Sequence, residues 1–339
     1  MTIHQQFRAD SALPQGSLIL VTGASGFLAS HIITEALHLG FCVRGVVRSK
    51  DKGKQTEALF NSPKYSSVVV QDMAADKPFD GVLHDVDGII HCASVTTFSP
   101  DAESVIPPTI TGTLNILHAA IRQSNVVRFV YTSSATAVTF PCNNLNGIIT
   151  AAAWNHEAVN MAQQAAADSP DMPFLVYSAS KMQAEQAVWR FTREEKPHFT
   201  VNCVLPATSF GRILGPAGES GKYIPDLVLR RAVSTHLPPQ YIVDVKDSAR
   251  IHLAALLDVT VANERVLAFG HSINWNDIID SIQQSRPELQ LPTRIPGLGR
   301  DLREVENSLA VNLLKKWWDK DAFTELDETV RENLVGVNG

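Results

Sequence analysis

The sequence predicts an α/β fold in which helices cover both faces of a doubly wound parallel sheet. Short runs of β-branched and other apolar residues alternate with longer stretches whose apolar residues recur at helical spacing. The short runs are apolar throughout, which indicates strands buried on both faces, as in a parallel sheet between helices. A glycine-rich turn also follows the first run directly, at the place where doubly wound sheets bind nucleotides.

Six strands and three helices follow from these patterns. The apolar runs predict strands at residues 18–22, 42–47, 68–71, 88–92, 127–132 and 200–205. Apolar residues at helical spacing predict helices at residues 30–39, 111–121 and 181–191.

The pattern also suggests a division of the chain. Residues 1–16 are expected to be an N-terminal extension, residues 17–205 mainly a nucleotide-binding domain, and residues 206–339 mainly a substrate-binding lobe. This second lobe is expected to be smaller and α+β in class, with segments that return to the sheet. Residues 146–172 are rich in Ala, Asn and Gln, and we interpret them as an insertion near the active site.

Composition and charge exclude several classes of protein. With 45% apolar residues among 339, the chain can form a packed core. Its net charge of -6 comes from 29 Lys and Arg against 35 Asp and Glu, and no basic run would follow a nucleic-acid backbone. The first 16 residues lack the apolar core of a signal peptide, and no run approaches the ~18 apolar residues of a membrane span. We therefore expect a cytoplasmic protein that binds neither nucleic acid nor membranes.

The four cysteines are widely spaced. Their spacing matches neither a metal site nor a disulfide framework. We expect buried, reduced thiols and no bound metal.

The glycine-rich turn has the spacing of a dinucleotide site, Gly23-x-x-Gly26-x-x-Ala29. Gly23 permits a tight turn, Gly26 lets backbone N–H groups approach a pyrophosphate, and Ala29 lets the helix pack closely on the strand. The position between a strand and a helix supports this interpretation. The alternative is a strand-to-helix turn that binds nothing. The cofactor contacts expected from the turn are Gly23, Ser25, Gly26, Phe27 and Leu28.

A basic pair after the second strand predicts which dinucleotide binds. NAD sites place an acidic residue here, but this chain has Arg48 and, one helical turn later, Lys52. A guanidinium matches the geometry of a 2′-phosphate, so NADPH/NADP+ is favoured over NAD. The alternative is a solvated basic turn.

Tyr177 and Lys181 stand four residues apart in a predicted helical stretch, so they share one face. A cation about 4 Å from a phenol is worth up to ~4 kcal/mol at an effective dielectric near 20. We therefore expect Lys181 to lower the pKa of Tyr177 toward neutral pH, where a general acid works best. The pair Ser133 and Ser134 ends the fifth apolar run and adds hydroxyl groups. The alternative is an ordinary surface Tyr and Lys.

Taken together, these motifs resemble the extended short-chain dehydrogenase/reductase family, with a Rossmann fold, from about Ser17 to the C-terminus. Within it, the sequence is most similar to fungal NADPH-dependent aldehyde and ketone reductases and to dihydroflavonol-reductase-like enzymes. Besides Gly23-x-x-Gly26-x-x-Ala29 and Tyr177-x-x-x-Lys181, the matching segments are residues 71–73, 89–94, 131–135, 204–207 and 241–247.

The resemblance implies a set of cofactor contacts at the carboxyl edge of the sheet. Asp72 and Met73 would border the adenine, and Ala93 and Ser94 would lie along the pyrophosphate and ribose. The stretch from Pro206 to about Ser209 would hold the carboxamide. Residues 243–247 look architectural, and we expect Asp247 to be a helix N-cap.

The resemblance also implies a catalytic trio of Ser134, Tyr177 and Lys181, with Ser133 as the alternative serine. Nicotinamide C4 would deliver hydride to a carbonyl carbon, while Ser134 and Tyr177 hydrogen-bond its oxygen and Tyr177 gives up a proton. Lys181 would bind the nicotinamide ribose. The chain departs from the family where many members carry an Asn before Gly-Thr, because Thr111 stands there. A proton relay through such an Asn is in doubt. Asn115 could substitute for it, but we expect Asn115 to be a packing residue on a helix surface or against a strand.

The substrate side of the site is predicted from residues beyond the catalytic strands. Most of the candidates are apolar, which favours a hydrophobic or aromatic carbonyl compound over a nucleotide sugar. They could equally be ordinary core residues. The candidates are Thr96, Thr97, Phe98, Phe140, Trp154, Phe210, Ile213 and Tyr223.

The function predicted from the sequence is NADPH-dependent reduction of an aldehyde or ketone to the alcohol by a monomer or homodimer. An imine or activated-alkene reductase of a biosynthetic pathway stays open, because hydride donation and a nearby acid serve those bonds too. An NAD-retaining epimerase or dehydratase is less favoured, because Ala135 and Thr136 replace the acidic pair of such dehydratases. A non-enzymatic NADP sensor is opposed by the presence of both Tyr177 and Lys181.

Overall fold

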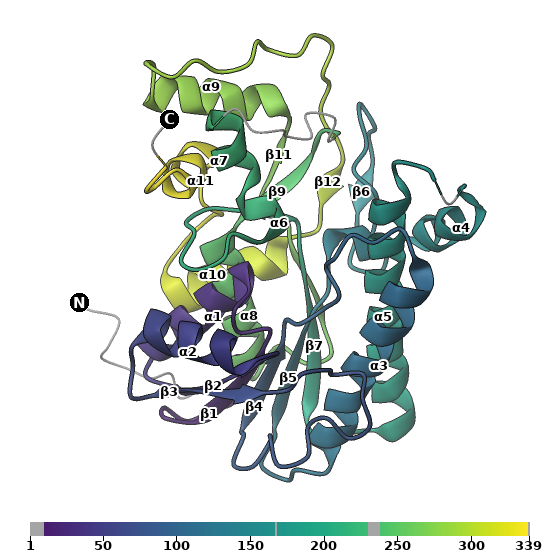
Figure 1. The fold of residues 1–339 in the computed structure, drawn as a ribbon, viewed down its shortest axis with the longest axis vertical. Helices are drawn as coiled ribbons and strands as arrows, with labels where there is room; N and C mark the ends of the chain where they lie inside the picture. Colours follow the sequence, from purple (N-terminus) through teal and green to yellow (C-terminus); the bar gives the residue numbers. More distant parts are fainter. Residues whose placement is uncertain (1–9, 167, 230–237, 338–339) are drawn as a thin grey trace.

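The structure is a computed structural model and describes residues 10–166, 168–229 and 238–337. Within these residues, seven parallel strands form one sheet in the order β10-β7-β5-β4-β1-β2-β3. Helices lie on both sides of the sheet, and a smaller group of strands and helices lies beyond its carboxyl end (Figure 1). The predicted fold class is confirmed.

Chain order reverses between β1 and β4, which pair in parallel at the middle of the sheet. Ligands of doubly wound sheets bind at such a point, outside the carboxyl ends of the strands. The strands of the sheet are β1 Leu18–Thr22, β2 Cys42–Val47, β3 Tyr65–Val69, β4 Gly88–His91, β5 Arg128–Thr132, β7 Thr200–Pro206 and β10 Arg265–Ala268.

Two strands differ from the prediction. Strand β3 begins and ends earlier than residues 68–71, because Ser66 and Ser67 pair with β2 through their backbones. It is an edge strand and partly exposed, so polar side chains are tolerated there. Strand β10 was not predicted, because its run is short and begins with a charged residue, Arg265.

The helices that cover the sheet form two layers (Figure 1). The three predicted helices exist, but α3 and α5 begin well before residues 111 and 181. In α3, Pro107 and Pro108 lie inside the helix, where proline is normally disfavoured. One layer holds α1 Phe27–His38, α2 Lys50–Phe60 and α8 Val245–Leu257, and the other holds α3 Ala102–Ile121 and α5 Met172–Glu195.

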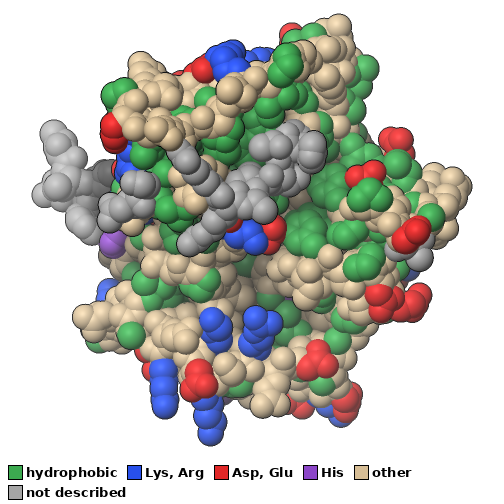
Figure 2. Space-filling view, turned by 45° about the horizontal axis from the view of Figure 1, so that its top comes forward, with side chains coloured by type: hydrophobic (Ala, Val, Ile, Leu, Met, Phe, Trp, Pro, Cys, Tyr) green, Lys and Arg blue, Asp and Glu red, His purple; other side chains and the backbone are tan. Residues whose placement is uncertain are grey.

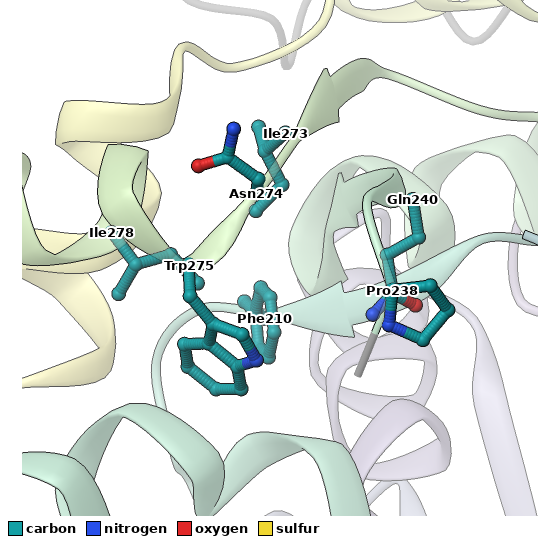
Figure 3. Close-up of a pocket in the computed structure, with 7 residues that line it drawn as sticks. All are labelled: Phe210, Pro238, Gln240, Ile273, Asn274, Trp275 and Ile278. Atoms are coloured by element: carbon teal, nitrogen blue, oxygen red, sulfur yellow. The ribbon is translucent and has the colours of Figure 1, made fainter. Parts of the chain in front are cut away.

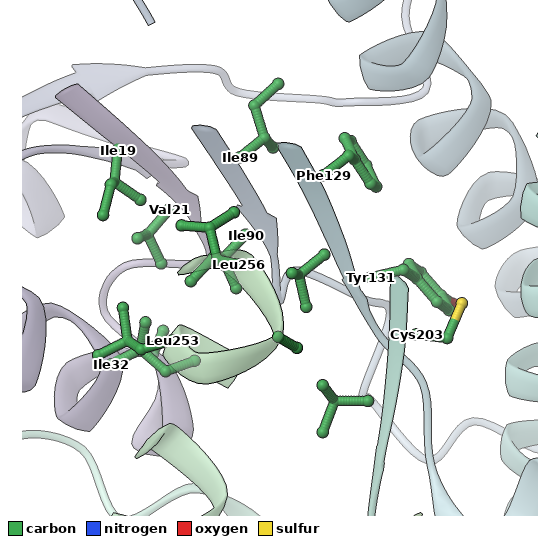
Figure 4. Close-up of a cluster of buried hydrophobic side chains, with 14 of the residues drawn as sticks. Ile19, Val21, Ile32, Ile89, Ile90, Phe129, Tyr131, Cys203, Leu253 and Leu256 are labelled. Carbon is green, nitrogen blue, oxygen red and sulfur yellow. The ribbon is translucent and has the colours of Figure 1, made fainter. Parts of the chain in front are cut away.

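The main core lies between these layers and the strands (Figure 4). Ile32 of α1 and Leu256 of α8 are fully buried beside the central strands, and so are Val21 and Ile90. The N-terminal segment contributes Leu13, which is 1% exposed. Burying such a side chain is worth about 1.5–3 kcal/mol, so these contacts hold the two halves of the chain together.

The smaller lobe has its own apolar cluster, which includes Phe210, Ile224, Ile278 and Val330. Its elements are β8 Thr208–Phe210, α6 Gly218–Gly221, α7 Tyr223–Val228, β9 Gln240–Asp244, β11 His271–Ile273, α9 Trp275–Ser285 and α11 Leu326–Asn333. Two further helices, a 3-10 turn and a two-stranded ladder border the large lobe: α4 His156–Gln164, α10 Ser308–Trp318, the turn Ala135–Ala137, β6 Ile148–Ile149 and β12 Glu304–Val305.

Segment 146–172 contains β6 and α4, and α4 packs on α5. Asn155 ties the segment to the turn after β5, because its side chain donates to the Thr136 carbonyl oxygen at 2.9 Å. The start of α4 therefore lies beside the carboxyl end of β5. Among the described helices, none is long and apolar enough to cross a membrane.

The predicted cap of α8 is wrong. Asp244, not Asp247, is the N-cap, and its side chain accepts from the Lys246 N–H at 2.8 Å. Asp247 lies inside the first turn, where it accepts two bonds of 2.6 and 2.7 Å from the Lys320 ammonium. A carboxylate in the first turn is favoured by the helix dipole, and the lysine removes the cost of burying its charge.

Arg128 joins the start of β5 to the end of α8. Its side chain donates to the carbonyl oxygens of Leu256 at 2.9 Å, Asp258 at 2.6 Å and Val261 at 2.7 Å. The residue is 5% exposed. These bonds satisfy carbonyl groups that the end of a helix leaves unpaired.

We expect Arg128→Met to lower the free energy of unfolding by about 3–5 kcal/mol, because the Leu256 carbonyl oxygen loses its donor and the carbonyl oxygens of Asp258 and Val261 each lose one of two donors. Urea denaturation of the apoprotein measures this loss. Arg122→Met is the control, since Arg122 forms an exposed ion pair with Asp80 at 3.5 Å, and such pairs contribute about 0–1 kcal/mol. Equal losses in the two variants would contradict the assignment.

Candidate active site

The carboxyl ends of β1, β4, β5 and β7 meet at one edge of the sheet, and helix α5 passes beside this edge. The predicted nucleotide turn follows β1, Ala93 and Ser94 follow β4, and the serine pair follows β5. Tyr177 and Lys181 come from α5. Segments far apart in the sequence are thus gathered at a single place.

Tyr177 is half-buried, and the Ser134 side chain is near enough to its hydroxyl group to lower the pKa of the phenol. Ser134 is 8% exposed, and its hydroxyl oxygen accepts from the Thr136 N–H at 3.2 Å. This bond caps the short 3-10 turn that follows β5 and fixes the rotamer of Ser134. The two hydroxyl groups can therefore approach one substrate oxygen together.

Ser133 has a different environment. Its hydroxyl donates to Glu185 Oε2 at 2.6 Å, and its backbone N–H donates to the Val204 carbonyl oxygen at 2.8 Å. Both groups are buried. Because this hydroxyl is already engaged away from Tyr177, the geometry favours Ser134 as the serine of the site.

Lys181 is 3% exposed, and its ammonium donates to the Thr132 carbonyl oxygen at 2.8 Å. The ammonium also lies 5.3 Å from the centre of the Tyr131 ring, a cation–π distance. Burial lowers the pKa of Lys181 to about 8, although the nearby Glu185 carboxylate acts in the opposite direction. The lysine can thus lose or hold its proton near physiological pH.

Two buried histidines near the lysine stay neutral. Burial lowers the pKa of His91 to about 3 and that of His252 to about 4, and the charge of Lys181 contributes to both shifts. His91 Nδ1 lies 2.8 Å from Thr22 Oγ1. His91 is therefore a hydrogen-bonded core residue and not a free ligand.

The expectation that Lys181 brings the pKa of Tyr177 toward neutral pH is wrong for this structure. Burial raises the pKa of Tyr177 above its ordinary value of 10.0, and the nearby Ser134 hydroxyl offsets only part of this rise. The desolvation of the phenolate is the dominant effect. The phenol is therefore protonated at neutral pH and able to donate.

The nucleotide turn has the backbone shape that the sequence predicts. Gly23 has φ +68, and an added Cβ would lie 3.1 Å from the Ala93 backbone, so a larger residue would not fit. The Gly26 N–H donates to the Gly23 carbonyl oxygen at 2.8 Å. Helix α1 then begins at Phe27 without a side-chain cap. Its free N–H groups and dipole form a site suited to a phosphate.

Ser94 supports the assignment of a cofactor site. Its hydroxyl oxygen is inaccessible and has no hydrogen-bond partner in the structure. Thr22 Oγ1 accepts from the Ala93 N–H at 3.0 Å, which holds this segment against the nucleotide turn. A buried polar atom without a partner is unusual in native proteins, and a ribose or phosphate group beside this turn would supply one.

The other predicted cofactor residues surround the same edge. Ser25 and Leu28 are partly exposed in the turn, and Arg48 is exposed at the end of β2. Lys52 is bonded to Gln55 at 3.1 Å and is not held by a carboxylate. Asp72 and Met73 follow β3, and Pro206 and Ser209 lie at the junction of β7 and β8. None of these placements conflicts with the prediction.

A segment after β8 packs over the start of α1. Added Cβ atoms at Gly218 and Gly221 would lie 3.1 Å from Phe27 side-chain atoms. The Ser220 hydroxyl donates to the Ser209 carbonyl oxygen at 2.7 Å, and the Asn333 side chain donates to the Gly221 carbonyl oxygen at 3.0 Å. The segment therefore links the nucleotide turn to the smaller lobe.

One of the predicted substrate residues, Phe98, lies beside Tyr177. The Phe98 ring stacks on the Tyr177 ring with centroids 4.9 Å apart and an interplanar angle of 29°. Phe98 also has φ +48, a strained conformation for a bulky residue that often occurs at functional sites. Tyr223 packs against Phe210 and Trp275 with ring centroids 6.5 Å apart in each pair.

The other predicted substrate residues are not brought to Tyr177 by a contact in the structure. Phe140 packs against Phe174 with ring centroids 5.9 Å apart, and Trp154 lies 3.8 Å from the Arg265 guanidinium. Thr97 is exposed. Phe210 is 1% exposed and packs in the core of the smaller lobe.

Phe210 also borders a small cavity in that lobe with Trp275, Gln240 and Ile278 (Figure 3). The cavity volume is about 10 Å³, which is room for roughly one water molecule. It is too small for a carbonyl substrate.

The face of the molecule in Figure 2 is hollowed near its centre, with hydrophobic side chains on one side and Lys or Arg side chains nearby.

Asn115 is a packing residue, as expected. Its side chain donates to the carbonyl oxygens of Met73 at 2.9 Å and Ala75 at 3.0 Å. It therefore fixes the segment after β3. Among the described residues, no group of three or more His, Cys, Asp or Glu side chains could hold a metal ion.

Sequence reasoning missed three residues that organise the site: Thr22, Glu185 and Arg265. Glu185 lies four residues after Lys181 on the buried face of α5. A carboxylate at that spacing in an apolar stretch was a usable signal, because a buried charge needs a partner. Thr22 and Arg265 gave no such signal, since their contacts depend on strand pairing.

Comparison with known proteins agrees with this arrangement. The model of the NAD dependent epimerase/dehydratase family matches residues 19–268. Aldehyde reductase 2 of Sporidiobolus salmonicolor is 34% identical over 336 residues, covering 96% of this chain and 97% of that protein. The protein named NAD-dependent epimerase/dehydratase terH of Aspergillus terreus is 35% identical over 335 residues, with 96% and 98% covered.

A solved structure is also similar. The yeast methylglyoxal/isovaleraldehyde reductase complexed with NADPH is 26% identical, with a TM-score of 0.79 over 94% of this chain and 98% of that chain.

We expect Lys181→Met to stabilise the apoprotein at pH 7 by roughly 3 kcal/mol, because the folded chain must bury an ammonium group whose pKa falls from 10.5 to about 8. Below pH 8 the lysine is charged in both states, and the full cost is present. Between pH 8 and 10.5 only the unfolded chain keeps the proton, so the wild type gains stability and the difference shrinks. Urea denaturation at several pH values measures it.

Lys54→Met is the control for this pH series, because Lys54 is exposed on α2. Its difference from wild type should stay flat. A flat difference for Lys181→Met as well would contradict the burial of a charged lysine.

Proposed function

The chain belongs to the NAD-dependent epimerase/dehydratase family, and on that premise we propose that it reduces an aldehyde or ketone to the alcohol with NADPH. The observation that carries this proposal is the proximity of the Ser134 and Tyr177 hydroxyl groups, with Lys181 one helical turn away and the nucleotide turn at the same edge of the sheet. A dehydratase or epimerase would need other groups beside the serine, and Ala135 and Thr136 occupy those positions.

The two hydroxyl groups suit a carbonyl oxygen that becomes negative during the reaction. Ser134 and Tyr177 can each donate a hydrogen bond to that oxygen, and such donors stabilise developing charge strongly in a site without water. Because burial keeps Tyr177 protonated, the phenol can transfer its proton to the oxygen. When bound, NADPH would supply the hydride. The residues of the chain supply the orientation and the proton.

Lys181 has two tasks in this proposal. It would bind the nicotinamide ribose, and it would favour the phenolate that remains after Tyr177 has donated its proton. Its pKa of about 8 lets it keep a positive charge at neutral pH. That charge stabilises a phenolate one turn away in a medium of low dielectric. The Thr132 carbonyl oxygen, at 2.8 Å, holds the ammonium in place.

The preference for NADPH rests on Arg48 and Lys52. Arg48 is exposed at the end of β2, where the adenosine ribose of a bound dinucleotide lies in this fold. No Asp or Glu ion pair to Arg48 occurs among the described residues, so its guanidinium is available to a 2′-phosphate. The NADPH bound by the yeast relative supports the same assignment.

The substrate is proposed to be a hydrophobic or aromatic carbonyl compound. The Phe98 ring stacks on the Tyr177 ring, and an aromatic lining favours apolar substrates. The names of the relatives from Sporidiobolus salmonicolor and yeast, an aldehyde reductase and a methylglyoxal/isovaleraldehyde reductase, support reduction of small carbonyl compounds.

The direct test is NADPH oxidation by the purified protein with a panel of aliphatic and aromatic aldehydes and ketones. We expect turnover of several aromatic members and weaker turnover of charged ones. Tight binding of NADPH without oxidation by any compound would contradict the proposal and favour a sensor of the cofactor.

Tyr177→Phe should lower kcat by about 100-fold or more, because a positioned proton donor typically contributes that much. The NADPH dissociation constant should change less than about threefold, since the proposal assigns the phenol hydroxyl to the substrate oxygen and not to cofactor binding. Steady-state kinetics and fluorescence titration measure the two effects.

Tyr241→Phe is the matched control for this variant. This substitution also removes a phenol hydroxyl group, but the Tyr241 hydroxyl donates to the Arg303 carbonyl oxygen in the smaller lobe. Its kcat should stay close to wild type. If Tyr177→Phe kept more than a tenth of wild-type kcat, Tyr177 would not be the acid.

Arg48→Ala should lower kcat/KM for NADPH about 10- to 100-fold and leave the value for NADH nearly unchanged, because hydrogen bonds to a charged group are worth about 1.5–3 kcal/mol. Kinetics with both cofactors measure the ratio. Lys54→Ala, on the exposed side of α2, controls for the general loss of positive charge. An unchanged NADPH-to-NADH ratio in Arg48→Ala would refute the 2′-phosphate assignment.

A further inference from the structure

A buried ion pair lies behind the catalytic serine. Glu185 of α5 is 0% exposed, and the Arg265 side chain of β10 is 9% exposed. Arg265 Nε donates to Glu185 Oε1 at 2.6 Å, and Arg265 Nη2 donates to Glu185 Oε2 at 3.2 Å. The same Oε2 accepts the Ser133 hydroxyl at 2.6 Å. We call Ser133, Glu185 and Arg265 the Glu185 clamp.

The need for stability does not explain this clamp. Removing two charges from water is costly, and well-packed apolar residues often serve as well or better in place of a buried ion pair. A buried pair that is kept in a core calls for another reason. The positions of the three residues in the fold supply one.

The Glu185 clamp joins the two elements that carry the catalytic hydroxyl groups. Tyr177, Lys181 and Glu185 are spaced by four residues, so they follow one face of α5. Ser133 immediately precedes Ser134. A bond from Glu185 to Ser133 therefore fixes the position of α5 along β5, and with it the distance between the Tyr177 and Ser134 hydroxyl groups.

The same clamp reaches segment 146–172. Arg265 Nη1 donates to the carbonyl oxygens of Ala151 and of Ala153, the latter at 2.7 Å. Its guanidinium lies 3.8 Å from the centre of the Trp154 ring. One guanidinium thus holds Glu185 on one side and the start of segment 146–172 on the other.

We propose that the Glu185 clamp is a positioning device for the reaction, with Glu185 holding Ser133 so that Ser134 meets Tyr177 in the reactive geometry. Glu185 and Arg265 would touch neither substrate nor cofactor. The inference rests on the proposed function, because it assigns positions within that same site. A misplacement of about 1 Å can cost about 100-fold in rate, so a remote carboxylate can control turnover.

Ser133→Ala is the primary variant, because it removes a single hydroxyl and leaves the ion pair intact. We expect kcat to fall about tenfold or more, while the NADPH dissociation constant and the substrate KM stay within about threefold. A loss of fold would instead lower both the active fraction and binding. Equal kcat in Ser133→Ala and wild type would overturn the proposal.

Trp189→Phe is the matched control. The Trp189 indole N–H also donates to the Glu185 carboxylate, at 3.1 Å to Oε1, whereas Ser133 donates to the other oxygen, Oε2. If the carboxylate network mattered only for stability, the two variants would lose similar activity. We expect Trp189→Phe to keep kcat close to wild type, and a loss equal to that of Ser133→Ala would overturn the proposal.

Glu185→Gln adds a pH readout. The groups that act on the Lys181 ammonium are Glu185 on its own helix, His91 and Cys92 from the end of β4, Tyr131 from β5, Cys203 from β7 and His252 from α8. Glu185 is the carboxylate among them, so its removal should move the basic limb of the kcat/KM profile to lower pH. Ser133→Ala should leave that limb in place.

If both variants left the basic limb in place, the coupling between Glu185 and Lys181 would be refuted. If the basic limb moved equally in both variants, the separate role of Ser133 would be refuted.

Crystal structures of the apo variants provide a readout that does not depend on activity. We expect the distance between the Ser134 and Tyr177 hydroxyl groups to lengthen in Ser133→Ala and to stay as in the wild type in Trp189→Phe. An unchanged distance in Ser133→Ala would overturn the proposal even if no substrate were found. A wild-type protein that reduces no compound, with the distance lengthened in Ser133→Ala, would refute the proposed function and leave the positioning role standing.

Discussion

The hydrogen bond from the Lys181 ammonium to the Thr132 carbonyl oxygen is the contact on which the site depends. It joins α5 to the last residue of β5, so the helix that carries Tyr177 is fixed to the strand that carries the serine pair. The bond also explains how a buried ammonium is tolerated, because a charged donor without a partner would be costly in a core. The same contact therefore determines both the geometry of the proposed catalytic groups and the packing of the core in this region.

The groups around this bond differ in charge at neutral pH: Lys181 is protonated, and its titratable neighbours His91, His252 and Cys92 are neutral. His91 and His252 stay uncharged because burial and the lysine charge both lower their pKa, and burial raises the pKa of the Cys92 thiol to about 12. Lys181 is thus the one group of this set that can change its charge near neutral pH. A proton lost by Tyr177 would leave a negative charge beside the single positive charge of the set.

The fold could be predicted largely from local patterns. Parallel strands buried on both faces leave continuous apolar runs, and the Gly23 turn needs a left-handed glycine, so both are visible in the sequence. Strand β10 could not be found in this way, because its place beside β7 is set by a long-range pairing that four residues do not encode. The starts of α3 and α5 were missed because proline and polar residues obscure their period.

The site was predictable in part. Chain order and helical spacing predict that Tyr177, Lys181 and Ser134 lie together at the carboxyl edge of the sheet, and the structure brings them there. The raised pKa of Tyr177 was not predictable, since burial depends on what packs around the phenol and outweighs the nearby cation. Trp154 looked like a pocket residue because it is aromatic, but its face is covered by Arg265, which the sequence places more than a hundred residues away.

The pairing of β10 with β7 has a consequence for how the chain can be divided. A fragment ending near residue 205 would lack both the outermost strand and helix α8, which covers one face. It would present a bare row of backbone donors and acceptors along β7 and an uncovered apolar layer over Val21 and Ile90, features that promote self-association. The sheet of the nucleotide-binding half is thus completed by β10 and α8 from the C-terminal part of the chain. Residues 17–205 alone do not form the whole of this half.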